Sequence, residues 1–296
     1  MFSTSKKHGG RLLAAVGIAA LATTAAVVSV SASADSGSAK QSSERPNSGP
    51  KPTVVLVHGA WADSSSWDQV VRLLQQDGYA VDVPPNPLRG LASDSAYLAD
   101  YLHSVEGPIV LVGHSYGGAV ITDAALGNTQ VKALVYIDAF IPDEGQSVLE
   151  LASAKPGSCL GGGGNPANVF NFVSFPGAPS GDYDLYAKIA PNSAYPGFAD
   201  CLANDLPPSE GAVLGATQRP ITLNALTEKS GPPAWKSVPS WSFIGTLDQA
   251  LPPAEQLVMS EHAGAHVTYG RASHLSMISD PEGVERVIER AADVAG

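Results

Sequence analysis

Charged residues are scarce in this 296-residue sequence, and basic residues are scarcer than acidic ones. Asp, Glu, Lys and Arg make up 15% of the chain, whereas an average soluble protein has about 25%. The 17 Lys and Arg residues are outnumbered by 28 Asp and Glu residues, which gives a net charge of −11. This composition excludes a disordered acidic chain and a coiled coil. Because no run of Lys or Arg follows the first few residues, the sequence offers no basic surface to a phosphate backbone, and nucleic-acid partners are excluded.

Long hydrophobic runs are also missing, apart from an uncharged stretch rich in Ala, Leu and Val at residues 12–30. Three basic residues precede this stretch, namely Lys6, Lys7 and Arg11, and the motif Ala32-Ser33-Ala34 follows it. This order predicts a signal peptide over residues 1–34, removed before Asp35, and hence a secreted, extracellular protein. The alternative is an uncleaved membrane anchor, because the stretch could nearly span a bilayer core of about 30 Å. Its many small residues and the adjacent cleavage motif favour secretion, with no stable membrane insertion afterwards.

Cysteine is nearly absent as well, with only Cys159 and Cys201 in the whole chain. In the oxidising compartment that a signal peptide implies, we expect the two to form a disulfide bond. Closing the loop between residues 159 and 201 would stabilise the fold by about 3–4 kcal/mol in the chain-entropy model. The alternative is a pair of unrelated buried thiols.

The remaining sequence alternates short β-branched runs with amphipathic stretches. The runs at 53–57, 80–83, 109–112 and 133–137 predict strands, and the stretches at 67–76, 93–104 and 119–126 predict helices. Such alternation is typical of an α/β fold in which helices cover both faces of a mostly parallel sheet. The alternation of strands and helices resumes late in the chain, where we expect strands at 241–244 and 265–269 and helices at 254–263 and 281–294.

Between these two parts the pattern dissolves into Gly, Pro and isolated aromatic residues. Residues 142–239 are too many for an ordinary loop, so we expect a small cap inserted between core segments 52–141 and 240–296. Short helical windows within the cap are expected at 184–190, 211–217 and 221–227. The polar Ser/Gly/Pro-rich residues 35–51 predict a disordered tether before the core.

A G-x-S-x-G motif, Gly113-His114-Ser115-Tyr116-Gly117, lies between a predicted strand and a predicted helix. In this context the motif forms a sharp turn that exposes the serine hydroxyl above the sheet edge, where the helix N-terminus favours developing negative charge. We therefore expect Ser115 to be a nucleophile. The backbone N–H of Tyr116 and that of Ala60, in the loop after the first core strand, are the expected donors of an oxyanion hole.

A serine nucleophile needs a histidine base and a carboxylate that orients it, in the chain order Ser, acid, His. Of the seven histidines, His274 is the best candidate for the base, because it follows the last predicted strand at its carboxyl end. Asp248 and Asp138 both follow strands in the same way. We favour Asp248 as the acid and expect Asp138 to accept hydrogen bonds at its strand end.

These motifs resemble those of the α/β-hydrolase superfamily. The chain is similar in particular to the esterase group that includes plant methyl-ester esterases, hydroxynitrile lyases and bacterial carboxylesterases. The resemblance rests on Val-His-Gly-Ala-Trp at 57–61, Gly-His-Ser-Tyr-Gly-Gly at 113–118, Gln-Arg-Pro at 218–220, Gly-Pro-Pro-Ala-Trp at 231–235, Gly-Thr-Leu-Asp at 245–248 and Ser-His-Leu-Ser at 273–276. It implies an α/β-hydrolase fold, a Ser115-Asp248-His274 triad, an oxyanion hole at Ala60 and Tyr116, and neither a metal nor an organic cofactor. Similar lyases carry Thr in place of Gly59 and Lys in place of Leu275, so the resemblance implies hydrolysis.

The expected function is therefore that of a secreted serine carboxylesterase acting on small to medium esters through an acyl-enzyme. The candidate substrate-binding residues are Trp61, Phe140 and Trp235, and further aromatic residues of the cap could line an apolar pocket. Two alternatives remain open. One is a ligand-binding protein of the same fold with slow turnover, and the other is a cofactor-free haloperoxidase or perhydrolase activity on the same triad.

Overall fold

The computed structural model describes residues 51–189 and 194–295. The expected signal peptide, and the expected tether except for its last residue, lie outside these ranges. Within them, no helix has both the length and the apolar character needed to cross a membrane.

The core is a six-stranded sheet with the order β2-β1-β3-β4-β8-β9, in which every pair of neighbours is parallel. Its strands are β1 (Thr53–Val57), β2 (Val81–Asp82), β3 (Ile109–His114), β4 (Val131–Ile137), β8 (Ser240–Gly245) and β9 (His266–Gly270). Every residue of β3 and β8 is buried. Burial on both faces is the reason that these strands read as continuous apolar runs in the sequence.

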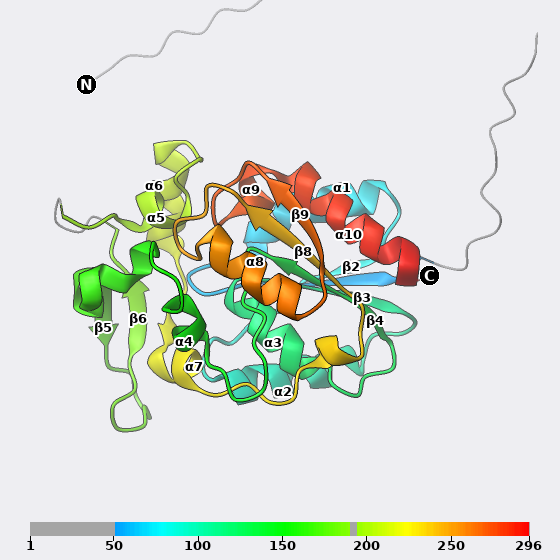
Figure 1. Ribbon diagram of the computed structural model, residues 1–296, viewed down its shortest axis with the longest axis horizontal. Helices are drawn as coiled ribbons and strands as arrows, with labels where there is room; N and C mark the ends of the chain where they lie inside the picture. The colour runs from blue at the N-terminus through cyan, green and yellow to red at the C-terminus, as the bar shows by residue number, and fades with distance from the viewer. Residues whose placement is uncertain (1–50, 190–193, 296) are drawn as a thin grey trace, which may run out of the picture. The chain divides into compact units, whose positions relative to one another are not determined.

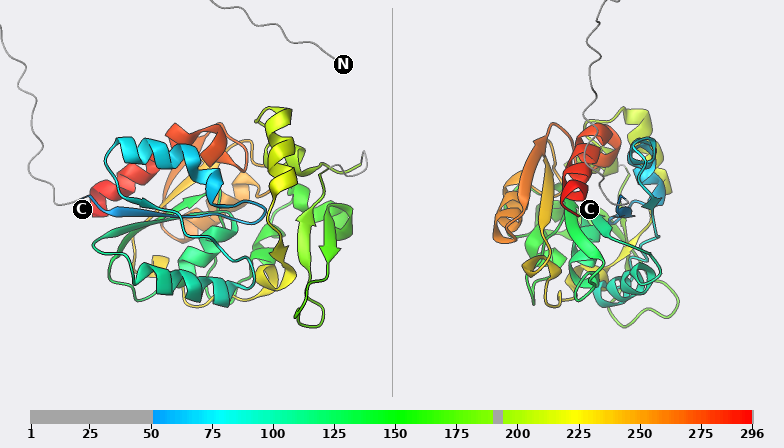
Figure 2. Two further views of the ribbon diagram at one scale, coloured as in Figure 1. Left: turned by 180° about the vertical axis from the view of Figure 1, so that it is seen from behind. Right: turned by 90° about the vertical axis from the view of Figure 1, so that its right-hand side faces the viewer.

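Helices cover both faces of this sheet (Figure 2). Helix α1 (Asp68–Gln76) packs with α10 (Pro281–Ala295) on one face, and α2 (Leu91–Leu102) packs with α3 (Tyr116–Ala124) on the other. Two further core helices, α8 (Pro253–His262) and α9 (Ser276–Ser279), precede and follow β9. The expected α/β-hydrolase architecture is thus confirmed.

The segment between β4 and β8 carries a second, three-stranded antiparallel sheet with the order β5-β6-β7 (Figure 1). Its strands are β5 (Phe170–Val173), β6 (Asp184–Ala187) and β7 (Ile221–Thr222). The helical elements around it are α4 (Val148–Ala152), the 3₁₀ segments η2 (Cys159–Gly164) and η3 (Pro166–Asn168), α5 (Phe198–Leu202), α6 (Pro208–Thr217), α7 (Leu223–Thr227) and η4 (Ala234–Lys236). A disulfide bond joins Cys159 of η2 to Cys201 of α5.

One of the three helical windows expected in this segment is wrong. Residues 184–187 form strand β6 rather than a helix, because they pair with β5 on one side and β7 on the other. Pairing with distant strands overrides local preference in such short windows. The window at 221–227 divides into strand β7 and helix α7, and the side chain of Thr222 caps the helix by accepting a hydrogen bond from the Ala225 N–H. The window at 211–217 lies in α6, as expected.

Candidate active site

Ser115 lies at the turn between β3 and α3, with φ of 52° and ψ of −123°. This positive φ is rare for a residue with a side chain and marks a strained turn. The flanking glycines allow the turn to form, because a Cβ at Gly113 would lie 2.5 Å from the Gly117 carbonyl oxygen, and a Cβ at Gly117 would lie 2.6 Å from that of Val57. The G-x-S-x-G pattern therefore reflects close contact between strand, turn and helix.

The structure brings Ser115, His274 and Asp248 into one hydrogen-bonded chain. His274 Nε2 lies 2.9 Å from Ser115 Oγ, and His274 Nδ1 lies 2.8 Å from Asp248 Oδ2. All three residues are buried, and each follows the carboxyl end of a parallel strand, namely β3, β8 or β9. This geometry allows a histidine to take the serine proton while a carboxylate fixes its ring.

Asp248 is held by three further donors that the sequence did not reveal. The backbone N–H groups of Ala250 and Leu251 donate to Oδ1 at 2.8 and 2.9 Å, and the Gln256 side chain donates to Oδ2 at 2.8 Å. Hydrogen bonds from three donors fix the orientation of the carboxylate. Asp248 is thus an acceptor ready for the histidine ring N–H.

Asp138, the competing acid, has different partners. Its Oδ1 accepts a hydrogen bond from the Gly245 N–H at 2.6 Å, and its Oδ2 accepts one from the Ser276 hydroxyl. The carboxyl is completely buried, and burial, with the nearby charge of Asp248, raises its pKa well above the usual range. Asp138 thus links the ends of two strands and the start of α9, as the sequence suggested, whereas the His274 ring is bonded to Asp248.

The two expected oxyanion donors, Ala60 and Tyr116, line a cavity together with Ser115. Tyr116 is the first residue of α3, so its N–H has no acceptor within the helix. Its hydroxyl donates to Asp94 Oδ2 at 2.8 Å, which fixes the ring. The N–H of the next residue in the first loop, Trp61, is used elsewhere, since it donates to the Arg219 carbonyl at 3.1 Å.

A buried histidine holds the loop that carries Ala60. His58 Nε2 accepts a hydrogen bond from the Asn86 N–H at 3.0 Å, which assigns the ring proton to Nδ1, 2.9 Å from the Gly59 carbonyl. Burial lowers the pKa of His58 to about 4, and the positive charge of Arg219 also lowers it. The ring is therefore neutral at pH 7 and serves as a fixed acceptor.

A cavity of about 420 Å³ opens from Ser115 and His274 into the inserted segment. Among the described residues, none of those lining it is Asp, Glu, Lys or Arg. Trp61 and Phe140 line the cavity, as expected, together with Phe170 and Phe172. The sequence did not single out the aliphatic residues that complete the wall, which are Val148, Leu149, Leu160, Leu185, Leu223, Leu226 and Leu251.

Trp235, expected to contact substrate, lies outside the cavity lining, which corrects that expectation. Its indole N–H donates to the Pro142 carbonyl at 2.9 Å, and its ring packs against His262. Trp235 therefore fastens the end of the inserted segment to the core. In the described part of the chain, no group of three or more His, Cys, Asp or Glu residues is placed to hold a metal ion.

The sequence matches the alpha/beta hydrolase family over residues 54–287. The chain belongs to this family. It is 26% identical over 260 residues to a putative chloroplastic methylesterase 11 of Arabidopsis thaliana, covering 81% of this chain and 64% of that protein. It is 34% identical over 110 residues to a carbendazim hydrolyzing esterase of a Nocardioides species, covering 33% of this chain and 46% of that protein. The chain thus spans about half to two thirds of the length of these relatives.

Solved structures show the same fold. A pyrethroid hydrolase from Sphingobium faniae has a TM-score of 0.65 at 22% identity, covering 82% of this chain and 97% of its own. An extracellular alpha/beta-hydrolase from a Paenibacillus species has a TM-score of 0.62 at 23% identity, covering 81% of this chain and 98% of its own.

Proposed function

We propose that the protein is a secreted serine hydrolase that cleaves neutral carboxylic esters of small to medium size. The observation that carries the proposal is the hydrogen-bonded chain from Ser115 through His274 to Asp248, opening onto a cavity without charged side chains. The relatives support ester hydrolysis, since their names include esterases and methylesterases. The signal-peptide pattern at residues 1–34 supports secretion.

In the proposed reaction, His274 Nε2 takes the proton of the Ser115 hydroxyl as its oxygen attacks the ester carbonyl. The carbonyl oxygen becomes an oxyanion, which the N–H groups of Ala60 and Tyr116 stabilise. His274 then protonates the departing alcohol and leaves an acyl group on Ser115. Water, deprotonated by His274, attacks this acyl group, the bond to Ser115 Oγ breaks, and His274 returns the proton to the serine oxygen as the acid leaves. Asp248 stabilises the positive imidazolium in both steps.

The size and the lining of the cavity support a proposal for the substrate class. Its volume lies in the range of about 300–1,000 Å³ that is usual for small-molecule sites. An apolar wall without charged partners disfavours an ionic substrate, because a buried charge without a partner is costly. We therefore expect esters whose acyl and alcohol parts are both uncharged.

The test is hydrolysis of p-nitrophenyl acetate and butyrate by the purified protein and by Ser115→Ala. We expect Ser115→Ala to lose at least about 10³-fold in kcat, while a fluorophosphonate labels only the unsubstituted protein, at Ser115. Equal rates for the two proteins would overturn the proposal. A matched pair, p-nitrophenyl butyrate and the mono-p-nitrophenyl ester of succinic acid, tests the substrate class, and equal kcat/KM for the two would contradict the preference for uncharged esters.

A further inference from the structure

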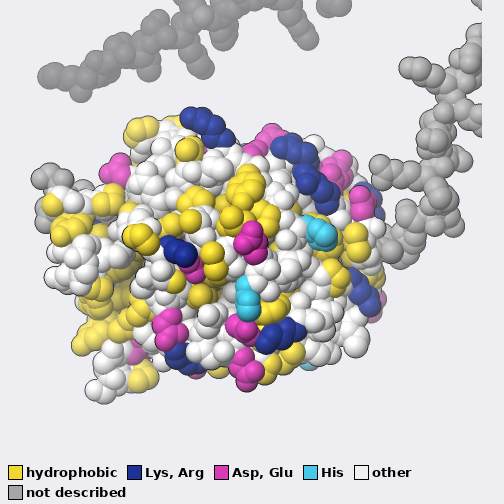
Figure 3. All heavy atoms as spheres, viewed as in Figure 1, with side chains coloured by type: hydrophobic (Ala, Val, Ile, Leu, Met, Phe, Trp, Pro, Cys, Tyr) yellow, Lys and Arg dark blue, Asp and Glu magenta, His cyan; other side chains and the backbone are white. Residues whose placement is uncertain are grey.

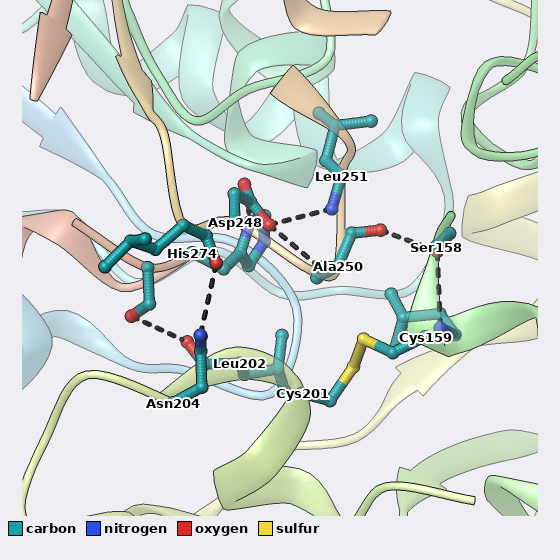
Figure 4. Close-up of a disulfide and its surroundings, with 12 residues drawn as sticks. Ser158, Cys159, Cys201, Leu202, Asn204, Asp248, Ala250, Leu251 and His274 are labelled. Carbon is teal, nitrogen blue, oxygen red and sulfur yellow. Dashed lines mark hydrogen bonds and ion pairs between the residues drawn. A yellow bond between two sulfur atoms is a disulfide. The ribbon is translucent and has the colours of Figure 1, made fainter. Parts of the chain in front are cut away.

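The disulfide bond lies beside the two loops that carry Asp248 and His274 (Figure 4). It joins η2, whose residues Leu160, Gly161 and Gly164 line the cavity, to the five-residue helix α5. Both cysteines belong to the inserted segment, whereas Asp248 and His274 belong to the core. The cross-link therefore sits where the inserted segment meets the candidate catalytic groups.

On the side of Cys159, two hydrogen bonds reach the residues that follow Asp248. The Ser158 hydroxyl donates to the Ala250 carbonyl at 2.6 Å, and the Cys159 N–H donates to the Gln249 carbonyl at 2.8 Å. The Ala250 N–H donates in turn to Asp248 Oδ1. The turn after Asp248 is thus held by hydrogen bonds to the Asp248 carboxylate on one side and to residues 158–159 on the other.

On the side of Cys201, the contacts reach both loops. The Asn204 side chain donates to the Leu247 carbonyl at 3.2 Å, directly before Asp248. Asp205 Oδ2 accepts a hydrogen bond from the Ser273 N–H at 2.8 Å, and the Ser273 hydroxyl donates to the Leu202 carbonyl at 3.3 Å. Ser273 directly precedes His274. Residues next to both candidate catalytic groups are therefore bonded to the segment that follows Cys201.

Neither cross-linked segment is stiff on its own. The segment η2 is Cys-Leu-Gly-Gly-Gly-Gly, and glycine has the largest backbone freedom to lose on folding. Helix α5 has only five residues, well below the length at which isolated helices are stable. The cross-link limits the arrangements open to both segments, and it thereby favours the positions in which they form hydrogen bonds with the Asp248 and His274 loops.

We propose that the Cys159–Cys201 disulfide, acting through Ser158, Asn204 and Asp205, positions Asp248 relative to His274. These are positioning residues, since they act on the loops and not on substrate. The inference rests on the proposed esterase function, in which the Asp248–His274 contact governs turnover. It gives the inserted segment a role in the chemical step in addition to that of forming the cavity wall.

The test compares Cys159→Ala/Cys201→Ala with the unsubstituted full chain, using p-nitrophenyl acetate because its small acyl group depends little on the cavity wall. We expect kcat to fall by about 10- to 100-fold, as for a misplacement of catalytic groups by about 1 Å, with KM changed less than threefold. The matched control is Ile221→Ala, which removes a buried side chain of β7 and destabilises the inserted segment by a similar amount without a tie to either loop. We expect its kcat to stay within threefold at a temperature where both variants are folded.

A double-mutant cycle distinguishes an effect that acts through the position of Asp248 from a general loss of order in the inserted segment. If the disulfide acts through Asp248, its removal in an Asp248→Asn background lowers the residual rate by less than threefold. The same fold-loss in both backgrounds, or an unchanged kcat in the cysteine variant, would overturn the inference. Where the cysteine variant does not fold, Asn204→Ala/Asp205→Ala keeps the disulfide and removes two of the ties, and an unchanged kcat in that variant would also overturn it. The proposed function fails by a different result, namely equal rates for Ser115→Ala and the unsubstituted chain.

Discussion

The indole N–H of Trp61 donates a hydrogen bond to the main-chain carbonyl of Leu185, 2.9 Å away. Trp61 directly follows the proposed oxyanion donor Ala60 and has a positive φ of 57°, whereas Leu185 lies in strand β6 of the inserted segment. The Trp61 ring also stacks on Phe170 of β5, with ring centroids 5.3 Å apart. The Trp61 side chain thus connects the loop that carries Ala60 to the antiparallel sheet of the inserted segment, at the cavity wall.

We expect Trp61→Phe to lower kcat on p-nitrophenyl butyrate by about 3- to 10-fold. The phenyl ring keeps the stacking on Phe170 but loses the hydrogen bond to the Leu185 carbonyl, which contributes about 0.5–1.5 kcal/mol. Trp235→Phe is the matched control, because it also removes an indole hydrogen bond of 2.9 Å, to Pro142, away from the cavity. Steady-state kinetics and thermal melting of both variants check this prediction, and a larger loss of kcat in Trp235→Phe would contradict it.

Replacing each of the two buried aspartates by asparagine is expected to change kcat to very different extents. Asp248→Asn should lower kcat by about 10⁴-fold, because an amide cannot hold the histidine in the required tautomer. Asp138→Asn should change kcat by less than fivefold, since burial and Asp248 already raise the pKa of Asp138 well above its usual range and favour its neutral form. An amide resembles that neutral acid and can still accept the Gly245 N–H. Kinetics of the two purified variants decide between the acids, and the reverse order of losses would assign the triad to Asp138.

The close contact between the first loop and the nucleophile makes Gly59 a sensitive position. A Cβ added there would lie 2.7 Å from the Ser115 Cβ and 2.8 Å from the His114 carbonyl oxygen. We therefore expect Gly59→Ala to displace Ser115 and reduce both kcat and the rate of fluorophosphonate labelling by at least about 10²-fold. Gly78→Ala tests whether a loss arises from added strain alone, because Gly78 has a positive φ and open space around it. An unchanged labelling rate in Gly59→Ala would contradict the prediction, because it would mean that the loop accommodates the added methyl group without displacing Ser115.

Much of the core was predictable because its signals are local. Strands β1 and β3 contain uninterrupted apolar runs. Ser115 lies in a five-residue motif that itself contains the two glycines its turn requires. Parallel strands bring their carboxyl ends to one edge of the sheet, which favours His274 as the base and makes both Asp248 and Asp138 candidate acids.

The inserted segment was harder to predict because its structure depends on distant partners. Residues 184–187 become a strand only through pairing with β5 and β7. The aromatic ring of Trp235 favours a place in the substrate pocket, yet aliphatic residues such as Leu226 and Leu251 form much of the cavity wall. The ties from Ser158 and Asn204 to the Asp248 loop have no sequence pattern at all, because they depend on how the segment folds back onto the core.

Glu285 makes the stability of the packing between α1 and α10 depend on pH. Glu285 of α10 is buried, and burial raises its pKa to about 7, as do the contact with Asp77 and the charge of Glu289, while Arg286 opposes the shift. Between the ordinary glutamate pKa of 4.5 and about 7, the unfolded chain releases this proton while the folded protein keeps it. Stability contributed by this group is therefore complete below pH 4.5, falls as the pH rises towards 7, and stays low above it.

Glu285→Gln removes this titration while keeping the shape of the side chain. We expect its Tm to exceed that of the unsubstituted protein at pH 8, and the difference to shrink or vanish at pH 5, because Glu285 is then protonated in the folded state. Glu282→Gln, on the exposed side of the same helix, controls for the loss of one negative charge. Thermal melts of the three proteins at pH 5, 6, 7 and 8 test the prediction. A Tm difference that is constant with pH, or equal for the two variants, would mean that Glu285 keeps an ordinary pKa in the folded protein.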